Sequence, residues 1–267
     1  METVIRPGRL QRLRLRLQKR MKSLDFRFRR WFRVGTIRSL YGPRFHTNFG
    51  DATFRLYIKG SYGRFYWDHL QNVDHDFVYL DIGANQGLYT IGAAQNPHSK
   101  QCIAFEPVPT VAHLLRNNLQ LNQVSGKCQV CEAAVSESSG QTTISLPAHH
   151  SGGASLREDD AGETEKLEIT TVCAADLEDI VPENGAPIRI KIDVEGHEEV
   201  VIRELLKSHF VDRIEEIFYE VDERWVDPDR VQTLLLGRGF QLERIGEGEH
   251  YDVMATRSDL PSEGFGG

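Results

Sequence analysis

The chain has 267 residues, 40% of them hydrophobic, and a formal net charge of −7. This size suits one large α/β domain plus a short extension, and the composition excludes wholesale disorder. No apolar run reaches the roughly 18 residues of a membrane-spanning helix, and no signal-peptide core is present. Cysteine is sparse, which fits a reducing compartment, and we therefore expect a cytoplasmic protein.

Residues 1–33 form a strongly basic segment. They carry twelve Lys or Arg against two acids, a local charge of +10, so the rest of the chain sums to −17. Apolar residues recur here at steps of three and four, at Leu10, Leu13, Leu17, Met21 and Leu24. The spacing predicts an amphipathic helix with arginines around its apolar stripe, and we treat residues 1–40 as a basic N-terminal extension.

Three interpretations of this extension stay open. The helix docks on its own domain or on a partner helix and leaves a solvated basic face. Alternatively, residues 1–33 contact an anionic membrane, which would place the protein at the inner face of that membrane. Nucleic acid or another polyanion is the third partner, but it is not expected because the chain carries no RNA-binding motif.

Residues 41–75 precede the α/β pattern, and we expect a cap or substrate segment there. The stretch TFRLYIKG, residues 53–60, predicts a short strand. SYGRFYWDHLQNV, residues 61–73, predicts a loop that leads into a helix. Together with loops near 147–166 and 222–229, this segment would recognise the substrate, although none of these loops carries a readable code.

The stretch FVYLDIGANQG, residues 77–87, predicts a buried strand, a terminal acid, a glycine-rich turn and a helix start. Asp81 ends the strand, and Gly83 and Gly87 would let the backbone turn tightly and come close to a ligand. Ligands of open α/β sheets bind outside the carboxyl ends of the strands. The stretch therefore predicts a nucleotide-like cofactor site, with a purely structural turn as the alternative.

The order of residues in this turn separates two kinds of cofactor. D-x-G-x-N-x-G departs from the G-x-G-x-x-G of dinucleotide-binding proteins, because Asn85 stands where that pattern has its second glycine. Asp81 would also repel a pyrophosphate at this position. A cofactor with a cationic centre and an amino group suits the acid better, and S-adenosylmethionine has both.

Strands and helices alternate along the rest of the chain. Strands are predicted at 101–106, 128–135, 142–146, 167–172, 188–193, 214–221, 240–245 and 251–257, and helices at 110–122, 197–210 and 229–240. The last two strands form a hairpin, so the α/β domain spans 76–257 and residues 258–267 form a flexible tail. Cys128 and Cys131 fall on opposite faces of their strand, which favours buried thiols over a metal or redox pair.

Two further groups of polar residues follow strands. Glu106 ends the strand after Asp81, and a carboxylate there can accept both ribose hydroxyls of S-adenosylmethionine or of a nicotinamide cofactor. Lys191, Asp193 and Glu195 alternate, so they face the same side if their strand continues. These residues would then lie at the carboxyl edge of the sheet, where the site is expected.

Several residues are candidates for a general base. His197 opens the helix after this strand, and imidazole suits proton transfer near neutral pH, although a packing role is equally compatible with this position. His149 and His150 are loop candidates, and the glycines of residues 151–156 suit either a mobile flap or a solvated hairpin loop. Two carboxylates without a clear third ligand are a weak signal for a divalent cation, so no metal is predicted.

Four stretches, taken in order, resemble the FkbM family of S-adenosylmethionine-dependent methyltransferases: VYLDIGANQGLYT, AFEPVPTVAHLLRNNLQLN, EAAVSESSG and RIKIDVEGHEEVVIREL. The resemblance runs from about Phe77 to about Tyr219, and more weakly to Thr256. It implies an α/β, Rossmann-like class I methyltransferase fold. That fold has a seven-stranded, mostly parallel sheet with an antiparallel last strand and helices on both faces.

The resemblance also implies roles for individual residues. Cofactor contact falls to Asp81, Gly83, Asn85 and Glu106, with Gly87 completing the turn and Ala133 and Ala134 beside the adenine. A substrate-side role falls to the strand of Lys191, Asp193 and Glu195. His197 stands where members often have a small or apolar residue.

We therefore expect an S-adenosylmethionine-dependent O-methyltransferase that acts on a hydroxyl of a sugar, glycolipid or natural product. Asp193 is expected nearest the reacting centre, with Lys191, Glu195 and His197 beside it. Two alternatives remain from the residues alone. One is a nicotinamide-dependent Rossmann oxidoreductase, and the other is a catalytically inactive membrane- or partner-binding module on the same fold.

Overall fold

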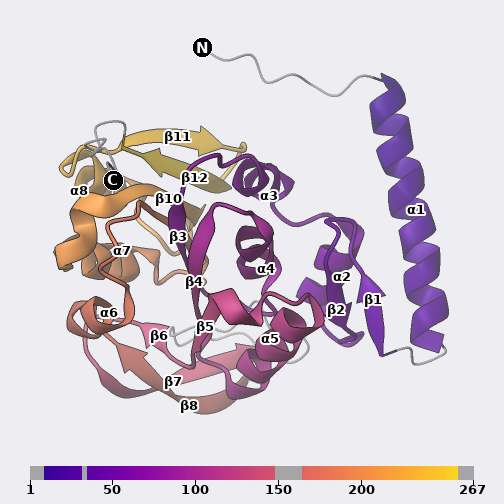
Figure 1. Cartoon of the computed structure of the whole chain (residues 1–267), viewed down its shortest axis with the longest axis horizontal. Coiled ribbons are helices and arrows are strands. Elements are labelled where there is room, and N and C mark those ends of the chain that lie inside the picture. The colour runs from indigo at the N-terminus through magenta and orange to yellow at the C-terminus, as the bar shows by residue number, and fades with distance from the viewer. Residues whose placement is uncertain (1–8, 32–34, 148–163, 258–267) are drawn as a thin grey trace, which may run out of the picture.

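The computed structural model describes residues 9–31, 35–147 and 164–257, and a seven-stranded sheet forms its centre (Figure 1). The strands lie in the order β11 (Gln241–Ile245), β12 (His250–Thr256), β10 (Ile214–Asp222), β9 (Ile188–Ile192), β3 (Phe77–Ile82), β4 (Ser99–Phe105) and β5 (Cys128–Cys131). Neighbouring strands are parallel except at β12, which is antiparallel to both β10 and β11. The predicted fold and its closing hairpin are confirmed.

Helices cover both faces of this sheet, which is why every residue of the central strands β3 and β9 is buried. One face packs against α6 (Ala174–Ile180), α7 (Glu198–Lys207) and α8 (Pro228–Leu236). The other face packs against α2 (Ala52–Lys59), α3 (Arg64–Gln71), α4 (Leu88–Gln95) and α5 (Pro109–Leu121). Two short 3₁₀ turns, Ser125–Lys127 and His209–Arg213, lead into β5 and β10.

The prediction of a strand at residues 53–60 was wrong, because this stretch forms α2. The Asp51 side chain accepts a hydrogen bond from Phe54 N at the start of the helix, and Gly60 ends it in the left-handed conformation. Phe54, Tyr57 and Ile58 are buried at helical spacing. Their β-favouring side chains suggested a strand, but the capping residues and the buried face decide for a helix.

Residues 128–135 were predicted as one strand but form two. β5 belongs to the central sheet, whereas β6 (Ala134–Val135) joins β7 (Gly140–Pro147) and β8 (Thr164–Val172) in a separate three-stranded sheet. Cys128 and Cys131 pack against the cores on opposite sides of the central sheet, as their spacing predicted. Both thiols are half-buried.

The N-terminal helix α1 (Arg9–Trp31) stands along one side of the molecule, next to β1 (Thr36–Arg38) and α2 (Figure 1). β1 pairs with β2 (Arg44–His46) in a two-stranded sheet of its own. In the described part of the chain, no helix is long and apolar enough to cross a membrane.

Candidate active site

Three neighbouring strands of the central sheet end at the same edge, and backbone hydrogen bonds hold their ends together. Gly83 N donates to Phe105 O at 3.0 Å, which ties the turn after β3 to the end of β4. Asp193 N donates to Ile82 O at 3.0 Å, which ties the end of β9 to β3. The predicted residues at positions 81–87, 106 and 193 therefore converge at one edge, as expected for parallel strands.

The glycine-rich turn serves packing within the protein. Gly83 and Gly87 have φ angles of 81° and 89°, which suit glycine and strain other residues. A Cβ on Gly83 would collide with the carbonyl oxygen of Asp193, and one on Gly87 would collide with the Leu115 side chain. The space left by the missing Cβ atoms was expected to admit a ligand, but Asp193 and Leu115 occupy it.

A cavity opens in front of this edge. Five of the predicted cofactor residues line it: Gly83, Asn85, Glu106, Ala133 and Ala134. Asp193, Glu195 and His197 line the same cavity, whereas Asp81 and Gly87 lie outside its lining. Tyr62 also lines it, and no motif around Tyr62 indicated this. The cavity is therefore lined by both apolar and acidic side chains.

Glu106 is held rigidly at the cavity wall. Its Oε2 accepts from Asn85 N at 2.9 Å and its Oε1 accepts from Val108 N at 3.0 Å. Burial raises the pKa of Glu106 to about 7, although both backbone donors oppose this shift. Each carboxylate oxygen can accept a second hydrogen bond, so the group can still take hydroxyl donors from a ligand.

Asp81 is a buried acid behind the cavity. Its Oδ2 accepts from Thr90 Oγ1 at 2.5 Å, and its Oδ1 has no hydrogen-bond partner among the described residues. Burial raises the pKa of Asp81, and the charge of Lys191 opposes that shift. A buried acceptor without a donor is costly, so the site fits a ligand that supplies an N–H group or an ordered water.

Lys191 and Tyr62 fix the carboxylate of Asp193. Lys191 Nζ lies 3.0 Å from Asp193 Oδ2, and the Tyr62 hydroxyl donates to the same oxygen. Burial lowers the pKa of Lys191, but the carboxylates of Asp193 and Asp81 outweigh burial and raise it, so the ammonium form is stable. Tyr62 lies 131 positions before Asp193, which is why sequence spacing did not reveal it.

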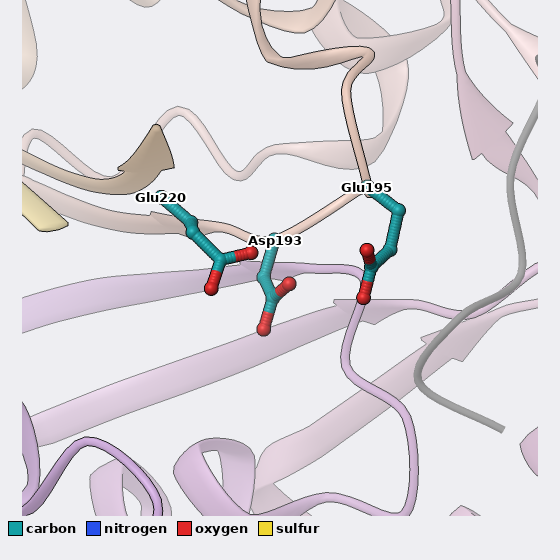
Figure 2. Close-up of side chains that lie close together, drawn as sticks. All are labelled: Asp193, Glu195 and Glu220. Atoms are coloured by element: carbon teal, nitrogen blue, oxygen red, sulfur yellow. The ribbon is translucent and has the colours of Figure 1, made fainter. Parts of the chain in front are cut away.

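The strand predicted to hold Lys191, Asp193 and Glu195 on one face ends before Asp193. β9 ends at Ile192, and Glu195 itself has a φ of 54°. The carboxylate of Glu195 still lies beside Asp193, and Glu220 from β10 joins them within 4.8 Å (Figure 2). Glu220 is the third carboxylate that sequence reasoning lacked. A cluster of acids is by itself weak evidence for a metal, and Lys191 already neutralises part of its charge.

A second cavity of about 440 Å³ adjoins the first, and the two share Tyr62 and Asp193 in their linings. Burial, followed by the charge of Asp193, raises the pKa of Glu220 to about 7 and that of Asp252 to about 6. His250 Nε2 lies 2.5 Å from Glu220 Oε1. The second cavity is acidic because four carboxyl side chains line it, and it is also aromatic, since Tyr89, Phe218 and Tyr251 line it.

Among the described histidines, His197 lines the first cavity and His250 lines the second. His197 precedes the first turn of α7, and its Nε2 lies 3.2 Å from Ser136 Oγ. Burial lowers the pKa of His197, which keeps its imidazole neutral at pH 7, and its side chain lines the first cavity but not the second. His149, His150 and the predicted flap at 151–156 lie outside the described residues.

Comparison with known proteins identifies the family to which the chain belongs. The model of the methyltransferase FkbM domain matches residues 81–242, which is more than half of the chain. The chain belongs to the FkbM methyltransferase family. The matched range contains the glycine-rich turn, Glu106 and the 191–195 segment that carried the predicted resemblance.

Relatives of this FkbM-family chain are distant. It is 27% identical over 227 residues to the 31-O-demethyl-FK506 methyltransferase FkbM of Streptomyces tacrolimicus, covering 73% of this chain and 84% of that protein. It is 24% identical over 184 residues to Methyltransferase 1 of Beauveria bassiana strain ARSEF 2860, covering 62% and 73%. A crystal structure of Methyltransferase FkbM from Methylobacillus flagellatus KT has 13% identity and a TM-score of 0.51, covering 76% of this chain and 52% of that one. That likeness supports the fold.

Proposed function

We propose that this FkbM-family methyltransferase uses S-adenosylmethionine to methylate a hydroxyl group of a sugar, glycolipid or natural product. The observation that carries the proposal is the meeting of two cavities at Tyr62 and Asp193. The first suits the cofactor and the second suits the acceptor. Asp193, held by two donors, then stands where the reacting groups would meet.

The first cavity fits S-adenosylmethionine on two counts. Glu106 presents a fixed carboxylate to which ribose hydroxyls can donate, and Ala133 and Ala134 leave room for a flat base beside them. Asp81 lies behind the turn of Gly83 and Asn85 and outside the cavity lining, so we propose that its Oδ1, which has no partner among the described residues, reaches the amino group of the cofactor through an ordered water. When bound, S-adenosylmethionine supplies an activated methyl group on a cationic sulfur.

On the acceptor side, the residues orient a hydroxyl and take its proton. The acceptor oxygen would take the methyl group as the sulfur–methyl bond breaks, which would leave S-adenosylhomocysteine, and the hydroxyl proton would pass to the Asp193 carboxylate. Lys191 and Tyr62 hold that carboxylate in place, and Glu195 lies next to it. Holding the hydroxyl in line with the methyl group supplies much of the acceleration. His197 lines only the first cavity, so we assign the proton transfer to Asp193.

The acidic lining of the second cavity narrows the acceptor class. Asp193, Glu220, Glu247 and Asp252 line it together with the cation Lys191 and with His250, so acids outnumber bases. Carboxylates accept hydrogen bonds from hydroxyl groups and repel anions. The acceptor is therefore a neutral or cationic polyhydroxyl or aromatic molecule, and a phosphorylated one is disfavoured. The name of the Streptomyces relative, which acts on 31-O-demethyl-FK506, supports a hydroxyl acceptor.

The family match favours a methyltransferase over the nicotinamide-dependent alternative. Calorimetric titration separates both from an inactive module. Binding of S-adenosylhomocysteine is expected, with no binding of NADH. Asp81→Asn should weaken that binding at least tenfold, whereas the exposed Asp76→Asn should not change it. Absence of binding at high micromolar S-adenosylhomocysteine would refute the assignment of the cofactor.

The site of methylation needs its own experiment. Acceptor candidates with and without phosphate are incubated with methyl-labelled S-adenosylmethionine, and the labelled product is isolated. A methyl ether survives mild base, whereas a methyl ester releases methanol. A labelled ester, a labelled amine or a preference for phosphorylated acceptors would contradict O-methylation in an acidic cavity.

A further inference from the structure

A continuous apolar stripe on α1 faces solvent. Its members recur at alternating steps of four and three, which place them along one side of the helix: Leu17, Met21, Leu24, Phe28 and Trp31. Their exposed fractions are 53%, 70%, 59%, 61% and 84%. Single exposed apolar residues are ordinary, but five large ones in a line mark an interaction surface.

The opposite side of α1 fixes the helix to the domain. Phe26 lies half a helical turn away from the centre of the stripe and is only 5% exposed. Its ring packs on Phe49 and Phe54, with centroid distances of 5.1 Å and 6.0 Å. Figure 1 shows β1 and α2 beside α1, and of the described elements none covers its outer side. The contact through Phe26 therefore turns the stripe away from the body of the protein.

The charge of the segment selects among partners for this stripe. Residues 1–33 carry a net charge of +10. A second copy of the same helix would bring two such segments together, and like charges at close range repel. RNA would bind the positive charge, but it offers no apolar surface against which Leu17, Met21 and Leu24 could be buried. An anionic bilayer offers both an apolar acyl region for the stripe and negative headgroups for the basic side chains.

We propose that α1 is an interfacial membrane-binding helix that lies in the surface of an anionic bilayer. The stripe buries in the acyl boundary, the arginines and lysines meet lipid headgroups, and Phe26 keeps the domain attached. This inference does not depend on the cofactor or on the methylation reaction. It concerns where the enzyme works, and it goes beyond the proposed activity.

Co-sedimentation of the full chain with vesicles tests the proposal. Vesicles of phosphatidylcholine with about a third phosphatidylglycerol should bind the protein, and vesicles of phosphatidylcholine alone should bind it at least tenfold more weakly. Raising the salt to about 0.5 M should reduce binding to the anionic vesicles, because it screens the charge. The variant Leu24→Ser/Phe28→Ser/Trp31→Ser keeps every charge and should lose at least tenfold in partitioning. Trp225→Ser/Leu236→Ser removes exposed apolar groups from elsewhere and should not change it.

Tryptophan fluorescence places the stripe directly. In a Trp225→Phe background, Trp31 is exposed and Trp67 is buried, so a blue shift on addition of anionic vesicles reports Trp31. The same shift should be absent in Trp31→Phe/Trp225→Phe. Circular dichroism before and after the substitutions checks that the helix is retained.

Several outcomes would overturn the proposal. Equal binding to neutral and anionic vesicles would remove the electrostatic part, and no vesicle binding would remove all of it. A dimer that the stripe substitutions dissociate would assign the stripe to a second copy. Binding to bulk tRNA without binding to vesicles would assign the segment to a nucleic acid.

Discussion

The two cavities that meet at Asp193 are built in different ways. Apart from Tyr62 and Ile144, the first is made by short stretches at strand ends: the turn after β3, the end of β4, the start of β6 and the segment after β9. The second brings together Tyr62, Lys191, Glu220 and Asp252, which are far apart in the chain. The first cavity follows from local backbone chemistry and the second from tertiary packing. A motif therefore identifies the cavity that we propose for the cofactor and carries little information on the cavity that we propose for the acceptor.

The largest expected effect lies where the two cavities meet. Asp193→Asn removes the carboxylate but keeps its size and hydrogen-bonding ability. Loss of a general base should lower kcat by about 10² to 10⁴-fold. The affinity for S-adenosylhomocysteine should change less than about threefold, because the proposed cofactor contacts lie elsewhere. Methyl transfer to the acceptor found by screening, together with calorimetry, checks both.

A matched substitution controls for a merely structural effect. Glu199→Gln removes a partly exposed acid on α7 that pairs with Arg203. It should leave kcat and cofactor affinity unchanged. If Asp193→Asn loses cofactor affinity as strongly as kcat, the division of the site into two cavities with separate roles is wrong.

The sequence predicted the first cavity and much of the fold because the relevant information is local. Asp81 lies near the end of an apolar strand, Gly83 and Glu106 follow apolar strands, and the order of parallel strands brings these ends together. Tyr62 and Glu220 could not be predicted in the same way. Tyr62 lies between α2 and α3, and Glu220 lies on β10, so both reach Asp193 only through the tertiary fold, and nothing near either residue encodes that contact.

The errors of prediction have the same origin. Residues 53–60 carry side chains that favour strands, but the buried face and caps of α2 decide for a helix. Gly83 and Gly87 were correctly read as turn residues, but their lack of a Cβ makes room for Asp193 and Leu115. The pattern identified the backbone conformation, and only the structure revealed which neighbour needed the space.

A second prediction tests whether position 83 requires glycine because Asp193 occupies the space of a Cβ. Gly83→Ala adds strain at positive φ and a collision with the carbonyl of Asp193, which together should cost about 3 kcal/mol of unfolding free energy or more. Gly239 has nearly the same φ, 82° against 81°, but open space where its Cβ would lie. Gly239→Ala should therefore cost only about 1 kcal/mol. Urea denaturation of the two variants measures the difference.

Equal destabilisation by the two alanines would mean that backbone strain alone explains the glycine at position 83. A larger loss at Gly83 supports the close contact between β3 and the end of β9. The Asp193 carboxylate then depends on that glycine for its position.

The smallest expected effect is the pH dependence of cofactor affinity. The pKa of Glu106 is raised to about 7, so its carboxyl is mostly protonated at pH 6 and mostly ionised at pH 8. Ribose hydroxyls donate better to the ionised form, and affinity scales with the fraction of protein in the competent state. The affinity for S-adenosylhomocysteine should therefore rise about tenfold from pH 6 to pH 8. Calorimetry across this range measures it.

Two variants separate Glu106 from the other acids with raised pKa values. Glu106→Gln cannot ionise, so its affinity should be weak and independent of pH. Glu220 lies in the second cavity, and its pKa is also raised to about 7. Glu220→Gln should therefore leave the pH dependence of cofactor affinity as it is in the native chain. If Glu220→Gln flattens the profile and Glu106→Gln does not, the acidic cavity binds the cofactor and the roles of the two cavities are exchanged.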